Sequence, residues 1–133
     1  MISGKQLHGL RVFDAEGAAL GRIQDIIADG RSGAVRGYIV SADGIISGVY
    51  FILAAEVATL DINGLRLKSG ISVRKRRIVK RGPNELHLGE LTSAKGCVTD
   101  ILIDQGRIAA VELSQGLLSD IRLGRQIFLW EEL

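Results

Sequence analysis

The feature that most limits the fold of this chain is a pattern of glycine and aspartate that occurs once in each half. Residues 21–29 and 96–104 share the spacing Gly-x3-Asp-x3-Asp at an offset of 75 positions. The segments that follow, 35–41 and 108–114, align at an offset of 73. The recurring residues are Gly21, Asp25, Asp29, Gly96, Asp100 and Asp104. Because 133 residues hold one ordinary domain or two very small ones, the repeat favours two similar small units.

The repeated unit has the pattern of short strands joined by tight turns. In the second copy the turn at residues 104–107 is short enough for a hairpin in which Gly106 has a positive φ angle. Asn63 and Gly64 indicate another hairpin, between strands at 57–61 and 65–68. The one helical signal is a single turn at residues 53–57. The sequence therefore predicts an all-β fold of two small barrels with little or no helix.

The opening of the chain resembles a known family. Residues 7–29 contain a strand, an Asp-x-x-Gly turn from Asp14 to Gly17, a Gly-x-apolar-x-Asp strand from Gly21 and a hairpin. This order is similar to that of the PRC-barrel family, which includes the cytoplasmic domain of the photosynthetic reaction-centre H subunit. The C-terminal barrel of the small-subunit ribosome maturation factor is another member. The likeness covers residues 3–68 and extends more weakly to 86–130. It implies two PRC-type β-barrels in tandem, and a binding or scaffold role without catalysis.

Charge is distributed unevenly along the chain. The expected units are a first barrel at 1–70, a basic connector at 71–85 and a second, shorter barrel at 86–133. The first is neutral and the third is acidic, whereas the connector carries six basic residues and only one acid. The basic residues are Arg74, Lys75, Arg76, Arg77, Lys80 and Arg81. Such a run can bind phosphate or an acidic protein surface. The plainer interpretation, which we favour, is a solvated strand or linker that keeps a sheet edge soluble.

The recurring glycines and aspartates are interpreted as structural. A glycine near the start of a strand, as at 21 and 96, permits a bulge or a sharp corner. The aspartates at 29 and 104 precede hairpin turns, where the carboxylate caps backbone N–H groups. Those at 25 and 100 lie within strands, where they accept backbone hydrogen bonds at a bulge or from a loop. Four residues of strand span about 13 Å, which is too far for Asp25 and Asp29 to ligate one ion. No metal site is predicted.

Catalytic signals are weak. Cys97 is the single thiol, so no internal disulfide forms and a reducing cytoplasm fits. The two histidines, His8 and His87, each follow a leucine. A catalytic dyad of Cys97 and His87 is an open alternative, and we disfavour it because no nucleophile motif surrounds the cysteine. No phosphate-binding, zinc or dinucleotide motif is present. The sequence predicts neither an enzyme nor a cofactor.

These observations predict a cytoplasmic, non-catalytic module that binds or scaffolds an unidentified protein. The barrels are expected to pack together or to form a homodimer, because open strand edges invite pairing. The alternative is RNA or ribosome-associated binding through residues 74–81, and a third reading is contact of the same run with anionic lipid. No transmembrane segment is predicted, since the longest uncharged window, 44–55, has twelve residues and a spanning helix needs about 20.

Overall fold

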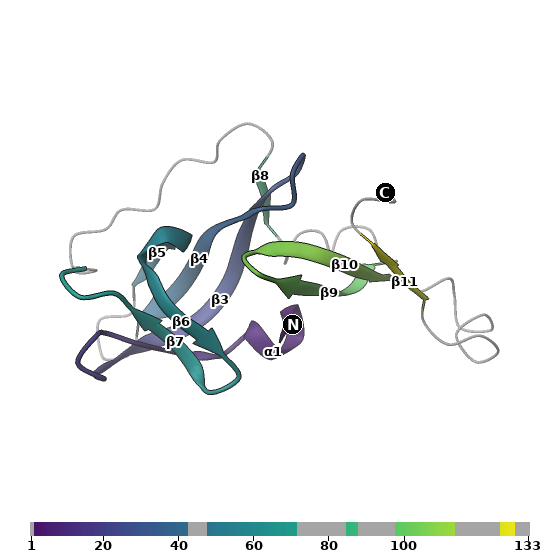
Figure 1. The fold of residues 1–133 in the computed structure, drawn as a ribbon. Coiled ribbons are helices and arrows are strands. Elements are labelled where there is room, and N and C mark those ends of the chain that lie inside the picture. Colours follow the sequence, from purple (N-terminus) through teal and green to yellow (C-terminus); the bar gives the residue numbers. More distant parts are fainter. Residues whose placement is uncertain (1, 43–47, 72–84, 88–97, 114–125, 130–133) are drawn as a thin grey trace.

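The computed structural model describes residues 2–42, 48–71, 85–87, 98–113 and 126–129, which form two β-sheets (Figure 1). The larger sheet has the order β5-β4-β3-β2-β7-β6, with β8 paired to β3. Its strands are β2 (Arg11–Phe13), β3 (Ala19–Asp29), β4 (Val35–Ala42), β5 (Val49–Leu53), β6 (Val57–Asp61), β7 (Gly64–Leu67) and β8 (Glu85–His87). The smaller sheet has the order β1-β9-β10-β11. Its strands are β1 (Ile2–Ser3), β9 (Val98–Asp104), β10 (Arg107–Leu113) and β11 (Gln126–Leu129). The predicted all-β class is confirmed.

Two short helices accompany the described strands. The 3₁₀ turn η1 (Ala54–Glu56) falls where the sequence predicted one helical turn. The helix α1 (Gly4–Leu7) was not predicted. Ser3 begins it with a capping box, in which the Ser3 hydroxyl accepts from the Gln6 N–H and the Gln6 side chain accepts from the Ser3 N–H. The cap allows this short helix to turn the fully buried Leu7 into the core.

The two repeated hairpins, β3–β4 and β9–β10, share their irregularities. In β3–β4 the register shifts at Gln24, the extra residue on β3, and at Arg36, the extra residue on β4. In β9–β10 the extra residues are Thr99 and Ala109. These lie 75 and 73 positions after their counterparts, which are the offsets of the sequence repeat. Since bulges bend and twist a ladder locally, the two hairpins bend at equivalent places.

The turns of these hairpins contact each other reciprocally. The Val35 N–H donates to the Gly106 carbonyl at 2.8 Å, and the Ile108 N–H donates to the Gly33 carbonyl at 2.7 Å. Val35 and Ile108 are repeat partners at the offset of 73, and so are the two glycines. An antiparallel bridge between residues 34 and 107 lies between the two bonds. We call this contact the hairpin junction; it has the form of a symmetric dimer contact made within one chain.

The smaller turn has the geometry expected for a two-residue hairpin. Gln105 and Gly106 have φ angles of 49° and 74°. Positive φ at both central residues is characteristic of a type I′ turn, whose twist matches that of the flanking strands. The sequence prediction of positive φ at Gly106 is confirmed.

Each repeated hairpin also receives a strand from the segment that precedes the other copy. Strand β1, at the start of the chain, pairs with β9 and places Ile2 opposite Ile103. Strand β8, just before the second copy, pairs with β3 and places Leu86 opposite Ala28. Positions 28 and 103 are equivalent in the repeat. The two halves are therefore linked in two ways. Each gives the strand before its own hairpin, β1 or β8, to the hairpin of the other half, and the two turns meet at the hairpin junction.

One hydrophobic core joins the two sheets. It combines buried side chains of the larger sheet, among them Ile23, Val40 and Ile52, with Ile101 and Ile108 of the smaller one. A unit of about 50–70 residues buries little apolar surface alone. Sharing the core gives both halves a larger buried volume.

Candidate interaction surfaces

The repeated aspartates have matching contacts at the two bulges. Oδ1 of Asp25 accepts a hydrogen bond from the Ile26 N–H at 2.8 Å, and Oδ1 of Asp100 accepts one from the Ile101 N–H at 2.7 Å. Asp100 is buried and also accepts from the Lys5 N–H at 3.2 Å. This carboxylate therefore links helix α1 to strand β9.

Replacing Asp100 with alanine is expected to lower the free energy of unfolding by about 2 kcal/mol, because one buried and one partly buried amide lose their acceptor. Asp100→Asn retains the Oδ1 acceptor and should stay within about 1 kcal/mol of the native protein. Urea titration followed by circular dichroism measures both differences. An alanine variant as stable as the asparagine variant would show that the carboxylate oxygen is not needed.

The turn aspartate Asp29 organises its own loop. Its Oδ1 accepts from the Arg31 N–H at 3.0 Å and its Oδ2 from the Ser32 hydroxyl at 3.2 Å. Arg36 lies 3.7 Å from Oδ2. The backbone bond from Arg31, with smaller contributions from Ser32 and the two arginines, lowers the pKa of Asp29. Asp104 is exposed at the start of the other turn. Within the described ranges, no three His, Cys, Asp or Glu side chains gather as metal ligands would.

Several other sequence-derived candidates lie outside the described residues, namely Arg74, Lys75, Arg76, Arg77, Lys80, Arg81, Gly96 and Cys97. His8 is exposed just after α1. His87 lies on β8, with Nδ1 at 3.8 Å from Oδ2 of Asp25. Its Nε2 is buried and has no hydrogen-bond partner in the described part of the chain. The structure thus brings His87 beside an aspartate that the sequence had not paired with it.

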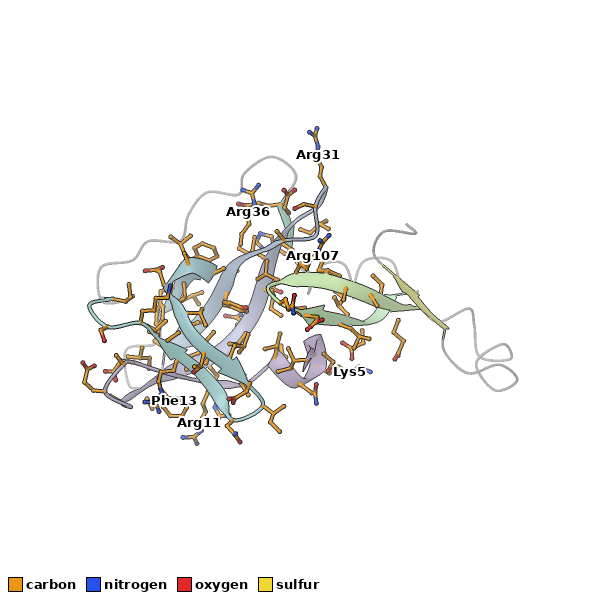
Figure 2. All side chains as sticks on the ribbon, viewed as in Figure 1. Lys5, Arg11, Phe13, Arg31, Arg36 and Arg107 are labelled. Atoms are coloured by element: carbon orange, nitrogen blue, oxygen red, sulfur yellow. The ribbon has the colours of Figure 1, made fainter. Side chains whose placement is uncertain are left out.

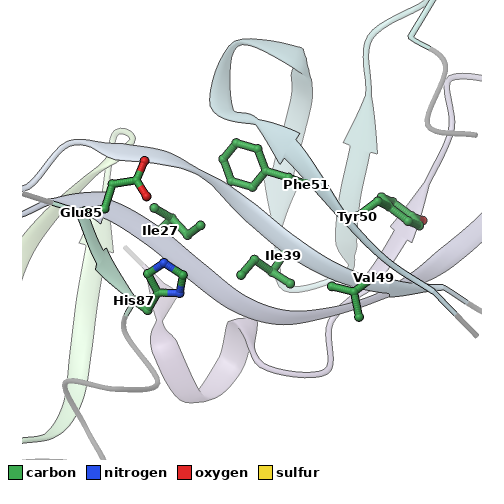
Figure 3. Close-up of a pocket in the computed structure, with 7 residues that line it drawn as sticks. All are labelled: Ile27, Ile39, Val49, Tyr50, Phe51, Glu85 and His87. Atoms are coloured by element: carbon green, nitrogen blue, oxygen red, sulfur yellow. The ribbon is translucent and has the colours of Figure 1, made fainter. Parts of the chain in front are cut away.

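A small cavity adjoins His87 on the outer face of the larger sheet (Figure 3). It is lined by Ile27, Ile39, Val49, Tyr50, Phe51, Glu85 and His87. Figure 3 shows that His87 and Glu85 come from β8, while the apolar residues come from β3, β4 and β5. The cavity measures about 30 Å³, room for about one water molecule, whereas small-molecule pockets measure about 300–1,000 Å³. It is too small for a substrate.

Strand β5 exposes apolar side chains beside this cavity. Tyr50 and Ile52 are buried inward, whereas Val49 and Leu53 are 39% and 47% exposed. Phe51, between them on the outer face, is half-buried. We call these three outward residues of β5 the apolar edge. In the described part of the chain, β5 ends the sheet and pairs only with β4. Edge strands usually carry charges that discourage further pairing, and the apolar edge carries none.

Sequence reasoning did not single out the apolar edge. The uncharged window 44–55 contains its three residues and is the signal from which it could have been found. Alternation alone does not say whether an apolar strand ends a sheet or lies within it. None of the described helices is long and apolar enough to cross a membrane.

A hollow of about 380 Å³ lies where the β6–β7 hairpin faces the β9–β10 turn. Its lining includes Tyr38, Ile62, Ile103 and Gln105. Tyr38 is buried on β4, and this burial raises the pKa of its hydroxyl to about 12. The hollow is open and of mixed polarity, with no cluster of reactive groups among its lining residues.

Stability is expected to fall between pH 10 and pH 12 because of Tyr38. An unfolded tyrosine ionises near pH 10, but the folded one ionises near pH 12, so folding favours the protonated form. The contribution is complete below pH 10 and is lost as the pH rises through 12, at a cost of about 3 kcal/mol. Urea denaturation at pH 9, 10, 11 and 12 measures the fall. Tyr38→Phe should lack this component, and an equal fall in the variant would assign it to other groups.

Comparison with known proteins finds a match over the first part of the chain. The family model of the PRC-barrel domain matches residues 1–84, which is 84 of 133 residues and contains β1 to β7. No curated protein matches the sequence.

Proposed function

Because the chain belongs to the PRC-barrel domain family, we propose that it is a small, non-catalytic interaction module whose protein partner docks along the apolar edge of β5. The observation that carries the proposal is the exposure of Val49 and Leu53 on a strand that ends the described sheet. A partner that brings an extended apolar segment would cover these side chains. It would also add main-chain hydrogen bonds to the sheet, which is a common way for sheets to recognise peptides.

The spacing of the apolar edge suits an extended partner segment. Val49, Phe51 and Leu53 are separated by two residues each, or about 7 Å along a strand. Alternate apolar side chains of the partner would meet them at the same interval. The neighbouring row on β4 includes Ile39, which lies opposite Phe51 and continues the apolar surface inward. The resulting surface suits a short extended strand.

We further propose that residues 86–133 form a second, shorter PRC-type unit. The shared bulges, the equivalent hairpins and the reciprocal junction support it. Cytoplasmic location, the absence of catalysis and the absence of a cofactor are parts of the same proposal that stay predictions. So does the alternative of RNA binding through residues 74–81, which lie outside the described ranges.

The test compares protein capture by the native chain and by a Val49→Lys/Leu53→Lys variant, from lysate of the native host with and without nuclease treatment. Ile62→Lys is the matched control, because Ile62 is 69% exposed on the β6–β7 turn, away from β5. A partner kept by the native chain and the control but lost by the double variant supports the proposal. Equal recovery by the double variant contradicts docking on β5, and recovery that disappears with nuclease favours RNA. Size-exclusion chromatography of the same proteins shows whether the partner is a second copy.

A further inference from the structure

Three arginines from distant parts of the sequence lie on neighbouring strands of the larger sheet. Arg11 on β2 is directly opposite Arg22 on β3, and Arg66 on β7 is paired with Phe13 on β2. All three arginines are exposed and Phe13 is half-buried. The residues between them, such as Val12, are buried, so the arginines share the outer face of the sheet. We call Arg11, Arg22, Arg66 and Phe13 the arginine face. Arg11 and Phe13, the two ends of the three-residue strand β2, are labelled beside each other in Figure 2.

The charge of the arginine face is not neutralised within the described chain. Like charges directly opposite each other destabilise a sheet, and Arg11 and Arg22 are such a pair. None of the three arginines forms an ion pair with another described residue. The adjacent Asp14 uses its Oδ1 to accept from the N–H groups of residues 16 and 18 in its own turn. An anionic ligand would remove the repulsion, and the guanidinium fork matches phosphate geometry.

Phe13 is held against the backbone between the arginines. A Cβ atom at Gly64 would lie 2.8 Å from Cε2 of Phe13 and 3.0 Å from the Arg11 carbonyl. Gly64 therefore permits the ring to lie close over β7, next to Arg66. A fixed and partly exposed aromatic ring amid arginines provides a surface on which a nucleic-acid base can stack.

The basic character continues along the chain from β7. Residues 66–82 include Arg66, Lys68 and the six basic residues of the connector, with no acidic residue among them. A long basic run in the sequence suits a long polyanion better than a single carboxylate or headgroup. The aromatic ring favours a nucleic acid over an acidic protein segment, because it offers a stacking contact that a carboxylate-rich chain does not use.

We propose that the arginine face binds single-stranded nucleic acid, with Arg11, Arg22 and Arg66 contacting phosphates and Phe13 stacking on a base. This site is separate from the apolar edge and does not depend on the docking of a protein there. It also differs from binding by residues 74–81 alone, because Arg11, Arg22 and Arg66 lie on strands of the larger sheet.

The test is fluorescence anisotropy of a labelled 12-nucleotide oligouridylate with the full chain, across a salt series. Arg11→Gln/Arg66→Gln is the principal variant. Arg22 is left unchanged because it also donates to the Gly9 carbonyl, so its replacement would disturb the backbone next to β2. Loss of two phosphate contacts should reduce the log–log salt slope by about 1.4 and weaken binding at low salt about tenfold. Phe13→Leu should weaken binding at least about fivefold without changing the slope. Circular dichroism checks that each variant is folded.

Arg31→Gln is the matched control, because Arg31 is equally exposed but projects from the β3–β4 turn, away from the arginine face (Figure 2). It should bind as the native chain does. The proposal is overturned if the native chain fails to bind at low salt, or if Arg31→Gln weakens binding as much as the double variant. It is also overturned if only replacement of Arg74, Arg76 and Arg77 has an effect. Stronger competition by polyglutamate or anionic vesicles than by unlabelled oligouridylate would assign the face to protein or lipid instead.

Discussion

Truncation of Ile108 to alanine is expected to lower the free energy of unfolding by about 4 kcal/mol. Ile108 is 1% exposed and belongs to the core that joins the two sheets. Removing its outer carbons leaves a cavity that the surrounding side chains fill only in part. Domains of this size are stable by about 5–15 kcal/mol, so the variant is expected to be marginally folded. Urea denaturation measured by circular dichroism gives the difference.

The same variant tests whether the two sheets unfold together. Because Ile108 packs in a core that includes Ile23 and Val40, amides of β3 and β4 should lose as much hydrogen-exchange protection as those of β10. The control is Ile62→Ala at an exposed turn position, which should change stability by less than about 0.5 kcal/mol. Full protection of β3 and β4 in the Ile108 variant would mean that the halves unfold independently.

Gly37→Val is expected to lower the free energy of unfolding by about 4 kcal/mol. A Cβ atom on Gly37 would overlap the Ile52 carbonyl and the Phe51 ring, both of which belong to the adjacent strand β5. Backbone cannot move aside as a flexible side chain does, so β4 and β5 would have to separate. Thermal unfolding of the variant and of Gly37→Ala measures the effect, and the alanine variant should lose about 2 kcal/mol.

The repeat provides a matched control for Gly37. The equivalent residue in β10 is Ala110, which is buried between β9 and β11. Ala110→Gly should cost about 1 kcal/mol through backbone entropy, whereas Gly37→Ala is costly through overlap. If Gly37→Ala stabilises the protein, strand β5 does not approach β4 as closely as the structure indicates.

Local signals in the sequence predicted the local structure well. Alternation, turn residues and the repeat indicated the all-β class, the β9–β10 turn and the η1 turn. The Asn63-Gly64 signal also placed a hairpin correctly, although the turn residues are Ile62 and Asn63. Gly64 instead begins β7 beneath Phe13. A short-range signal can therefore identify a hairpin without assigning the role of each glycine.

Contacts between distant segments could not be predicted from the sequence. The pairing of β1 with β9 joins positions about a hundred residues apart, and no local periodicity encodes such a register. The arginine face was unpredictable for the same reason. Arg11, Arg22 and Arg66 become neighbours only when β2 lies between β3 and β7. Helix α1 was missed because four residues beginning with glycine carry too little propensity to be recognised without the Ser3 cap.

The hairpin junction bears on what a small β protein gains when one chain carries the same hairpin twice. A chain with a single copy would present the same donor and acceptor at its turn, and it could satisfy them only by meeting another molecule. Its folding would then depend on protein concentration, as that of an obligate homodimer does. In this chain the two partners are covalently tied, so dilution does not separate them. Each copy is also free to acquire different surface residues, an asymmetry that an assembly of identical subunits cannot achieve.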